Sequence, residues 1–242
     1  MIIEICANSF ASAKAAQDGG AHCIELCTEL SVGGLTPSHG LIEKAITELD
    51  IPVHVLIRPR SGNFTYSEVE LDIMLRDVAF CKKMGCAGIV SGVLTVGNEI
   101  DFDKTEQLIN ASEGMEFTFH RAFDWVENPM KELQKLIDLK VNRLLSSGQK
   151  PTAIEGISLL KELKDYSEEK LEIMPGGGVS IKNALTFKEA GFTSIHLSAT
   201  TKKQVLATKP KVAMHSDVFF EEGIVATSNL ETIQKIIQLL LE

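Results

Sequence analysis

The sequence lacks the features that mark membrane, secreted and nucleic-acid-binding proteins. No apolar run approaches the ~18 residues that suggest a membrane-spanning helix. The first ten residues, MIIEICANSF, have neither the positive start nor the long apolar stretch of a signal peptide. A net charge of −9 argues against non-specific binding to nucleic acid, which needs a basic face. We therefore expect a cytoplasmic protein that binds neither membrane nor nucleic acid.

Cysteine is sparse, and its spacing matches no standard metal motif. The five cysteines are an odd number in no disulfide-dense pattern, and the sequence contains no CxxC or HxxxH. These absences favour reduced thiols, as in the cytoplasm. Interdomain linkers and low-complexity tracts are also absent. A chain of 242 residues that is 44% hydrophobic therefore fits one globular domain.

The sequence does contain a strand and helix unit repeated along its whole length. Apolar residues at three- and four-residue spacing predict the helices. The units predict an α/β protein with a TIM-like (β/α)8 barrel as a single domain over residues 1–242. An open doubly wound sheet is the main rival, but it usually needs fewer strands. A long loop is expected at about 200–228, before the last helix. The expected strands span residues 2–6, 22–27, 53–57, 88–91, 116–120, 143–146, 171–174 and 194–197.

Polar side chains gather where the expected strands end. Active sites of (β/α)8 barrels lie at the carboxyl ends of the strands. A barrel with only a structural role would not need polar residues there, so their concentration predicts a functional site. The polar strand ends comprise Glu4, Cys6, Glu25, Cys27, His54, Arg58, Arg60, Ser91, His120, Arg121, Asp124, Ser146, Ser147, Gly176, Gly177, Gly178, His196 and Ser198.

Two strand ends repeat the pattern Glu-x-Cys, which places a carboxylate and a thiol on one face of a strand. The second strand neighbours the first, and barrel closure brings the eighth strand to its other side. Cys6, Cys27 and His196 are therefore expected to converge. Two thiolates, with or without the imidazole, suit Cu(I), or Zn(II) with further ligands. The alternative is that the cysteines only fill space in the core.

A second candidate site is the triple glycine of MPGGGVS at residues 174–180. Gly176, Gly177 and Gly178 allow backbone N–H groups to converge on an anion. The loops after strands seven and eight are the usual phosphate site of these barrels, so His196 and Ser198 are assigned to the same anion or substrate site. A tight turn that only needs positive φ is the alternative.

Two further stretches supply charged side chains. In LIRPRSGNF (56–64), Arg58 and Arg60 are predicted to bind a substrate anion, or to pair with Glu25 as the nearest carboxylate. In TFHRAFD (118–124), His120 and Asp124 can form an acid and base pair, and Glu25 is a third candidate for proton transfer. No strand end carries a lysine suited to a Schiff base, and no organic cofactor is predicted. A structural ion pair and a structural histidine are the alternatives.

Together these stretches resemble the CutC family of copper homeostasis proteins. The resemblance runs in order from residue 2 to about 199 and departs from the family's more common IRPRGGDF at Ser61 and Asn63. The matching motifs are EIC, IELC, GGLTPS (33–38), IRPRSGNFTYS (57–67), TFHRAFD (118–124), LLSSG (144–148), MPGGGVS (174–180) and IHLSA (195–199).

The resemblance implies a cytoplasmic barrel that forms dimers or larger homo-oligomers, with copper binding at Cys6 and Cys27. We therefore expect a copper homeostasis protein that binds Cu(I) through these two thiolates. The alternative is an enzyme of the isomerase or lyase type acting on a small anionic or phosphorylated substrate. An interaction module that keeps the barrel only as a scaffold is a third reading.

Overall fold

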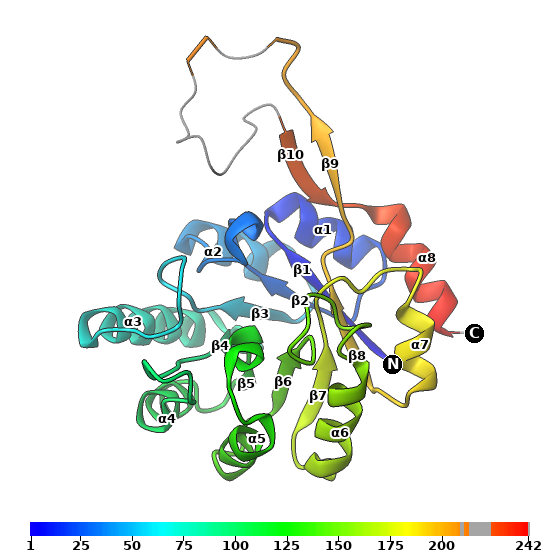
Figure 1. Cartoon of the computed structure of the whole chain (residues 1–242). Helices are drawn as coiled ribbons and strands as arrows, with labels where there is room; N and C mark the ends of the chain where they lie inside the picture. Colours follow the sequence, from blue (N-terminus) through cyan, green and yellow to red (C-terminus); the bar gives the residue numbers. More distant parts are fainter. Residues whose placement is uncertain (209–210, 213–223, 242) are drawn as a thin grey trace.

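The computed structural model describes residues 1–208, 211–212 and 224–241, and its centre is a sheet of eight parallel strands (Figure 1). The strands are hydrogen-bonded in the order β7-β6-β5-β4-β3-β2-β1-β8, and a parallel bridge between Gly176 and His196 joins the two ends. The prediction of a TIM-like barrel is therefore confirmed. The strands are β1 (Ile2–Ala7), β2 (Cys23–Leu26), β3 (Val53–Leu56), β4 (Gly88–Ser91), β5 (Glu116–Phe119), β6 (Arg143–Ser146), β7 (Glu172–Pro175) and β8 (Ser194–Leu197).

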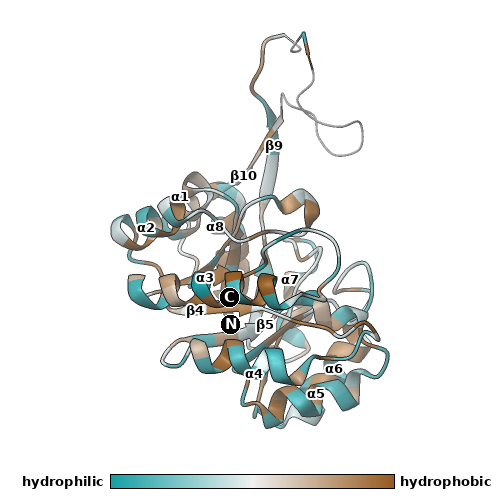
Figure 2. Ribbon diagram, turned by 90° about the vertical axis from the view of Figure 1, so that its left-hand side faces the viewer, coloured by the Kyte–Doolittle hydropathy of each residue, from teal (hydrophilic) through white to brown (hydrophobic). Residues whose placement is uncertain are grey.

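Helices surround the sheet, and local signals set where they begin. In the longest, Ser67 and Glu70 form a capping box, in which each side chain accepts from the other residue's backbone N–H. Figure 2 shows teal and brown stripes along the outer helices, as expected for helices with one face on the core. They are α1 (Phe10–Asp18), α2 (His39–Glu48), α3 (Glu68–Met84), α4 (Phe102–Ala111), α5 (Pro129–Asp138), α6 (Ile157–Ser167), α7 (Ala184–Glu189) and α8 (Leu230–Leu241), with the 3-10 turns η1 (Leu30–Val32) and η2 (Arg121–Trp125).

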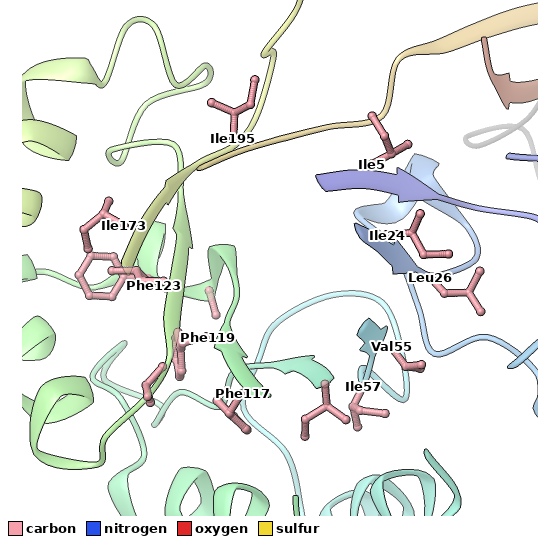
Figure 3. Packing of buried hydrophobic residues seen from close by; sticks show 14 of the residues in the cluster. Ile5, Ile24, Leu26, Val55, Ile57, Phe117, Phe119, Phe123, Ile173 and Ile195 are labelled. Atoms are coloured by element: carbon pink, nitrogen blue, oxygen red, sulfur yellow. The ribbon is translucent and has the colours of Figure 1, made fainter. Parts of the chain in front are cut away.

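Alternation along the strands separates an apolar layer from a polar barrel interior. Ile5, Ile24 and Val55 belong to the buried hydrophobic cluster that the strands share with the helices (Figure 3). In each strand, the residues before and after these positions point to the opposite face of the sheet. Glu4 of β1 contacts Arg143 of β6, which lies on the far side of the sheet order, so this second face is the inside of the barrel.

The part of the barrel interior nearer the amino ends of the strands is organised around the fully buried carboxylate of Glu4. Its Oε2 accepts from Nη1 of Arg143 at 3.1 Å and lies 3.4 Å from Nδ1 of His54. Its Oε1 lies 2.9 Å from Nδ1 of His196, and the Cys23 thiol donates to Oε2 at 3.5 Å. Five different strands thus meet at one carboxylate.

The partners of Glu4 decide its charge. Burial alone would raise the pKa of this carboxyl, but the hydrogen bond with His196, the close contact with His54 and the charge of Arg143 hold its pKa well below the usual range. Glu4 is therefore ionised in the folded protein. The space for His54 depends on Gly88, because a Cβ at that position would lie 2.2 Å from the imidazole Cδ2.

The prediction of a loop at about 200–228 is wrong at both ends of that range, where the structure has strands. The structure pairs β9 (Thr200–Gln204) with β10 (Ile224–Ser228) as an antiparallel ribbon that projects from the barrel beside α1 (Figure 1). All residues of β9 are exposed, so the strand has none of the apolar alternation from which strands are predicted. Residues 209–210 and 213–223 of the predicted loop lie outside the described residues.

The base of the ribbon is tied to the barrel. The backbone N–H of Ser228 donates to Oγ of Ser12 in α1, and its hydroxyl donates to the carbonyl of Ser198 just after β8. The last helix, α8, then returns to the outer layer, where Ile233 and Ile236 are buried. None of the helices among the described residues combines the length and the apolar composition that crossing a bilayer requires.

Replacing Glu4 should destabilise the barrel strongly. Glu4→Gln keeps the shape of the side chain but leaves Arg143 and His196 without their buried counter-charge, which typically costs about 3–5 kcal/mol. Urea unfolding followed by circular dichroism measures the loss. Glu48→Gln, which removes an exposed carboxylate paired with Lys44, is the control and should stay within about 0.5 kcal/mol. Equal effects of the two substitutions would contradict the role given to Glu4.

Lowering the pH should reduce the difference in unfolding free energy between wild type and Glu4→Gln. The folded-state pKa of Glu4 is depressed, so its charge stabilises the fold above the unfolded-chain pKa of about 4.3. That contribution is lost as the pH falls through the lower folded-state pKa. Because Glu4 also helps to raise the pKa of His196, the gap in unfolding free energy should be largest between about pH 4.5 and pH 6 and should shrink below about pH 4.

Candidate functional site

A cavity of about 470 Å³ opens at the carboxyl ends of the strands. Most of its polar lining comes from residues that the sequence predicts as site residues, because parallel strands bring their carboxyl ends to one edge. Leu30, Gly33, Phe64 and Val179 also line it and were not predicted individually. Three of these four lie inside the GGLTPS, IRPRSGNFTYS and MPGGGVS motifs, which is the signal that can find them. The predicted residues that line the cavity are Cys6, Glu25, Arg58, His120, Gly177, Gly178, His196 and Ser198, together with Arg121.

The two predicted metal ligands lie together at one side of this cavity. The Sγ atoms of Cys6 and Cys27 are 3.6 Å apart, and the Cys6 thiol donates to Oε1 of Glu25 at 3.3 Å. The convergence follows from strand register, since Cys6 of β1 is paired with Glu25 of β2. One donor atom from each of the three residues lies within 4.8 Å of the others. Cys27 is fully buried, so Cys6 is the thiol that the cavity reaches.

The Cys6 thiol is protonated at neutral pH. Its hydrogen bond with Cys27, its burial and the nearby charge of Glu25 raise its pKa well above the usual value. Burial also raises the pKa of Glu25, against the charge of His196, which lowers it. A metal ion binding here therefore has to displace at least one proton.

Two other clusters have metal-like composition but already hold a cation. Glu4 with Cys23 and His54, and Glu4 with Glu25 and His196, each bring donor atoms within 4.8 Å of one another. The guanidinium of Arg143 is hydrogen-bonded to Glu4 and balances its charge, so a second cation would be repelled. Among the described residues, Cys6, Glu25 and Cys27 form the one such cluster without Glu4.

His196 links the buried network to the cavity. Its Nδ1 is bonded to Glu4, and the ring also lines the cavity. Burial alone would lower the pKa of His196, but the charge of Glu25 and hydrogen bonds with Cys6 and Glu4 raise it well above the usual value. The imidazolium therefore offsets the carboxylates around it.

The predicted pairing of Glu25 with Arg58 is wrong. Arg58 donates instead to the carbonyls of Val32, Gly34 and Gly62, at 2.7, 2.9 and 2.9 Å. β3 ends at Leu56, so Arg58 lies in the loop that follows, and its guanidinium meets the backbone of this loop and of the loop after β2. Arg58 thus holds these loops while it lines the cavity.

Arg60, also predicted at the anion site, is turned away from it. It forms an ion pair with Glu70 of α3 and donates to the carbonyls of Ser61, Asn63 and Thr65. It is absent from the lining of the cavity. Its role is to hold its own loop against α3.

Among the described residues, no hydrogen bond joins His120 and Asp124, the two predicted candidates for acid and base. The carboxylate of Asp124 accepts from Nε of Arg121 at 2.8 Å and from the hydroxyls of Ser146 and Ser147 at 2.6 and 2.8 Å. The 3-10 turn η2 separates the two side chains and lets Asp124 serve as a clamp for Arg121. Asp124 is therefore a positioning residue in this geometry.

His120 is a neutral, buried ring with one nitrogen unused. Its Nδ1 accepts from the backbone N–H of Ala122 at 3.2 Å, so the ring proton belongs on Nε2. Burial and the charge of Arg58 lower the pKa of His120 to about 3. Among the described residues, Nε2 has no hydrogen-bond partner, although the ring lines the cavity.

The glycine loop follows β7 and lines the same cavity, with β8 between it and β1. Gly176 donates its N–H to the carbonyl of Ser146. The N–H groups of Gly177, Gly178 and Val179 have no acceptor in the part of the chain that the structure describes. Gly177 has φ +101°, and a Cβ there would lie 3.1 Å from Cζ of Arg121, so only glycine allows this approach.

Comparison with known proteins adds to this geometry. The CutC family model matches residues 1–201. A family protein CutC from Pasteurella multocida is 45% identical over 199 residues, which are 82% of this chain and 82% of the relative. A family protein CutC from Bacteroides thetaiotaomicron is 41% identical over 238 residues, 97% of this chain and 94% of the relative.

A solved structure agrees with the sequence relatives. The crystal structure of a CutC protein from Streptococcus agalactiae, assigned to copper homeostasis, has a TM-score of 0.77 and 35% sequence identity. The match covers 82% of this chain and 98% of that chain. All eight barrel strands fall inside the residues that the family model matches. The protein described here therefore belongs to the CutC family.

Proposed function

We propose that this protein binds Cu(I) through the thiolates of Cys6 and Cys27 and acts in copper homeostasis in the cytoplasm. The observation that carries the proposal is the pair of sulfur atoms 3.6 Å apart at the edge of the cavity. Thiolate sulfur is a soft ligand that selects Cu(I) over the hard cations. The assignment of the Streptococcus agalactiae relative to copper homeostasis supports this reading.

The surroundings of the two cysteines fit such an ion. The pair lies between apolar side chains, Leu56 and Val90, with the carboxylate of Glu25 on the open side. These apolar neighbours limit the contact of a thiolate complex with water. All five cysteines are free thiols, which agrees with a reducing compartment. Association into a homo-oligomer remains a prediction from the family resemblance.

Each thiol should be required for Cu(I) binding. Cys6→Ser and Cys27→Ser each replace one soft ligand by a hydroxyl, and each should weaken Cu(I) binding by about 100-fold or more. Competitive titration with a Cu(I) chelator under anaerobic conditions measures the affinity. Cys86→Ser is the control, because that buried cysteine lies after α3 and away from the cavity. Unchanged Cu(I) affinity in both Cys6→Ser and Cys27→Ser would contradict the copper proposal.

Cu(I) affinity should rise with pH. Because the pKa of Cys6 is raised, metal and proton compete for its sulfur across the neutral range. Each proton displaced makes the apparent affinity up to about tenfold stronger per pH unit. Titrations between pH 6 and pH 8, corrected for the chelator, measure the slope. In Cys6→Ser the residual binding should have a shallower slope, whereas a flat wild-type profile would show that the thiol is not displaced.

The second candidate function is an enzyme of the isomerase or lyase type that acts on a small anionic or phosphorylated substrate. The observation that favours it is the cavity itself, in which the buried carboxyl of Glu25 lies on one wall and the glycine loop on another. Copper binding alone requires neither the loop nor His120. Wild type should then convert a compound from a panel of small phosphate esters, followed by NMR, and Glu25→Gln should not.

A further inference from the structure

Copper binding leaves one wall of the cavity without a role. The sulfur ligands come from the ends of β1 and β2, whereas the residues after β5 and β7 carry hydrogen-bond donors and no soft ligand. Among the described residues, four donors of this wall have no acceptor: the backbone N–H groups of three consecutive residues, 177–179, and one imidazole nitrogen, Nε2 of His120. The imidazole nitrogen is buried, and a buried donor is normally paired, so this wall calls for an acceptor from outside the chain.

Arg121 is fixed in a position beside Gly177, the first residue of the three amides. Its Nε is held by Asp124 at 2.8 Å and its Nη2 by the hydroxyl of Ser147 at 2.8 Å. Its remaining nitrogen, Nη1, lies 3.1 Å from where a Cβ of Gly177 would be. With two nitrogens already bonded, the guanidinium has little freedom left to lose when an anion binds.

The charge of the cavity favours an anion at this wall. Arg58, Arg121, His196 and Glu25 line it, and Asp124 and Glu4 balance Arg121 and His196, whereas Arg58 bonds only to carbonyls and keeps its charge unbalanced by a direct carboxylate partner among the described residues. This local surplus contrasts with the net charge of −9 for the whole chain. Together with the amides of Gly177, Gly178 and Val179, it suits a group with several acceptor oxygens and more than one negative charge.

His120 adds a different kind of donor at the same wall. Only 6% of the residue is exposed, and its Nε2–H has no partner within the described residues. The room for its ring is made by Gly92, because a Cβ there would lie 2.6 Å from Nδ1. A neutral N–H donor of this kind fits an uncharged oxygen, such as a carbonyl or a hydroxyl.

We propose that this wall is the binding site of a small phosphate monoester. The backbone N–H groups of Gly177, Gly178 and Val179 and the guanidinium of Arg121 bind the phosphate, and Nε2–H of His120 donates to a carbonyl or hydroxyl oxygen of the same molecule. The inference rests on the second candidate function and names its substrate class. It is independent of the copper ligands Cys6 and Cys27.

Two probes separate the two parts of the site. Inorganic phosphate offers only the anion, whereas dihydroxyacetone phosphate offers the same group and a carbonyl oxygen. Isothermal titration of metal-free protein at constant ionic strength should show both binding to wild type, with the ester bound more tightly. Arg121→Gln should weaken both by about tenfold or more, as expected for loss of a charge-assisted contact. The matched control is Arg76→Gln, an exposed arginine on α3, and it should change neither.

His120 is tested by the difference between the probes. His120→Phe should weaken the ester about tenfold and leave inorganic phosphate unchanged, because only the ester reaches Nε2. If this variant fails to fold by circular dichroism, His120→Gln keeps an N–H donor and should bind the ester within a few-fold of wild type. A loss of ester affinity in folded His120→Gln as large as that expected for His120→Phe would overturn the role of the donor.

Further outcomes of these experiments test the phosphate site and the enzymatic function separately. Absence of binding of either probe at millimolar concentration, or equal binding by wild type and Arg121→Gln, would overturn the phosphate site. Ester binding without conversion of any ester would sink the enzymatic function but support the site, whereas conversion of only uncharged compounds would overturn both the site and its substrate class.

Discussion

The structure depends on one buried charge, the carboxylate of Glu4. Removing a carboxylate from water costs several kcal/mol unless partners replace the lost hydration. Here Arg143, His196, His54 and Cys23 replace it, and they belong to β6, β8, β3 and β2. A residue of β1 is thereby connected to strands all around the barrel. The same contact fixes which face of each of these strands points inward, since a shift by one residue would exchange the polar and apolar faces.

The candidate site is the next layer above this charge. Two residues further along β1 comes Cys6, and two residues beyond Cys23 comes Glu25, so both point into the barrel like the residues below them. His196 touches both layers, because it binds Glu4 and lies beside Cys6 and Glu25 at the cavity. The protonation of the thiol and of Glu25 is therefore set partly by the network beneath them. A metal ion at Cys6 would be felt by the same groups that hold the barrel closed.

The cavity mouth has two chemically different sides. The side of β1 and β2 offers sulfur and a carboxylate, which suit a soft metal ion. The side that follows β5 and β7 offers Arg121, His120 and free amides, which suit oxygen anions. The ribbon of β9 and β10 belongs to neither side. It begins at Thr200, where the match to the family model is ending, and its base is anchored on α1.

The sequence by itself determined the barrel and the membership of most of the cavity lining. Strand periodicity and the polar strand ends are local, and parallel strands necessarily bring those ends together. What each polar group binds was decided only by the tertiary structure. Arg143 reaches Glu4 across 139 residues of sequence, Arg58 finds loop carbonyls instead of Glu25, and Asp124 turns to Arg121 instead of His120. The physical reason is that a hydrogen-bond donor takes the nearest well-oriented acceptor, and backbone carbonyls of folded loops cannot be located from residue types.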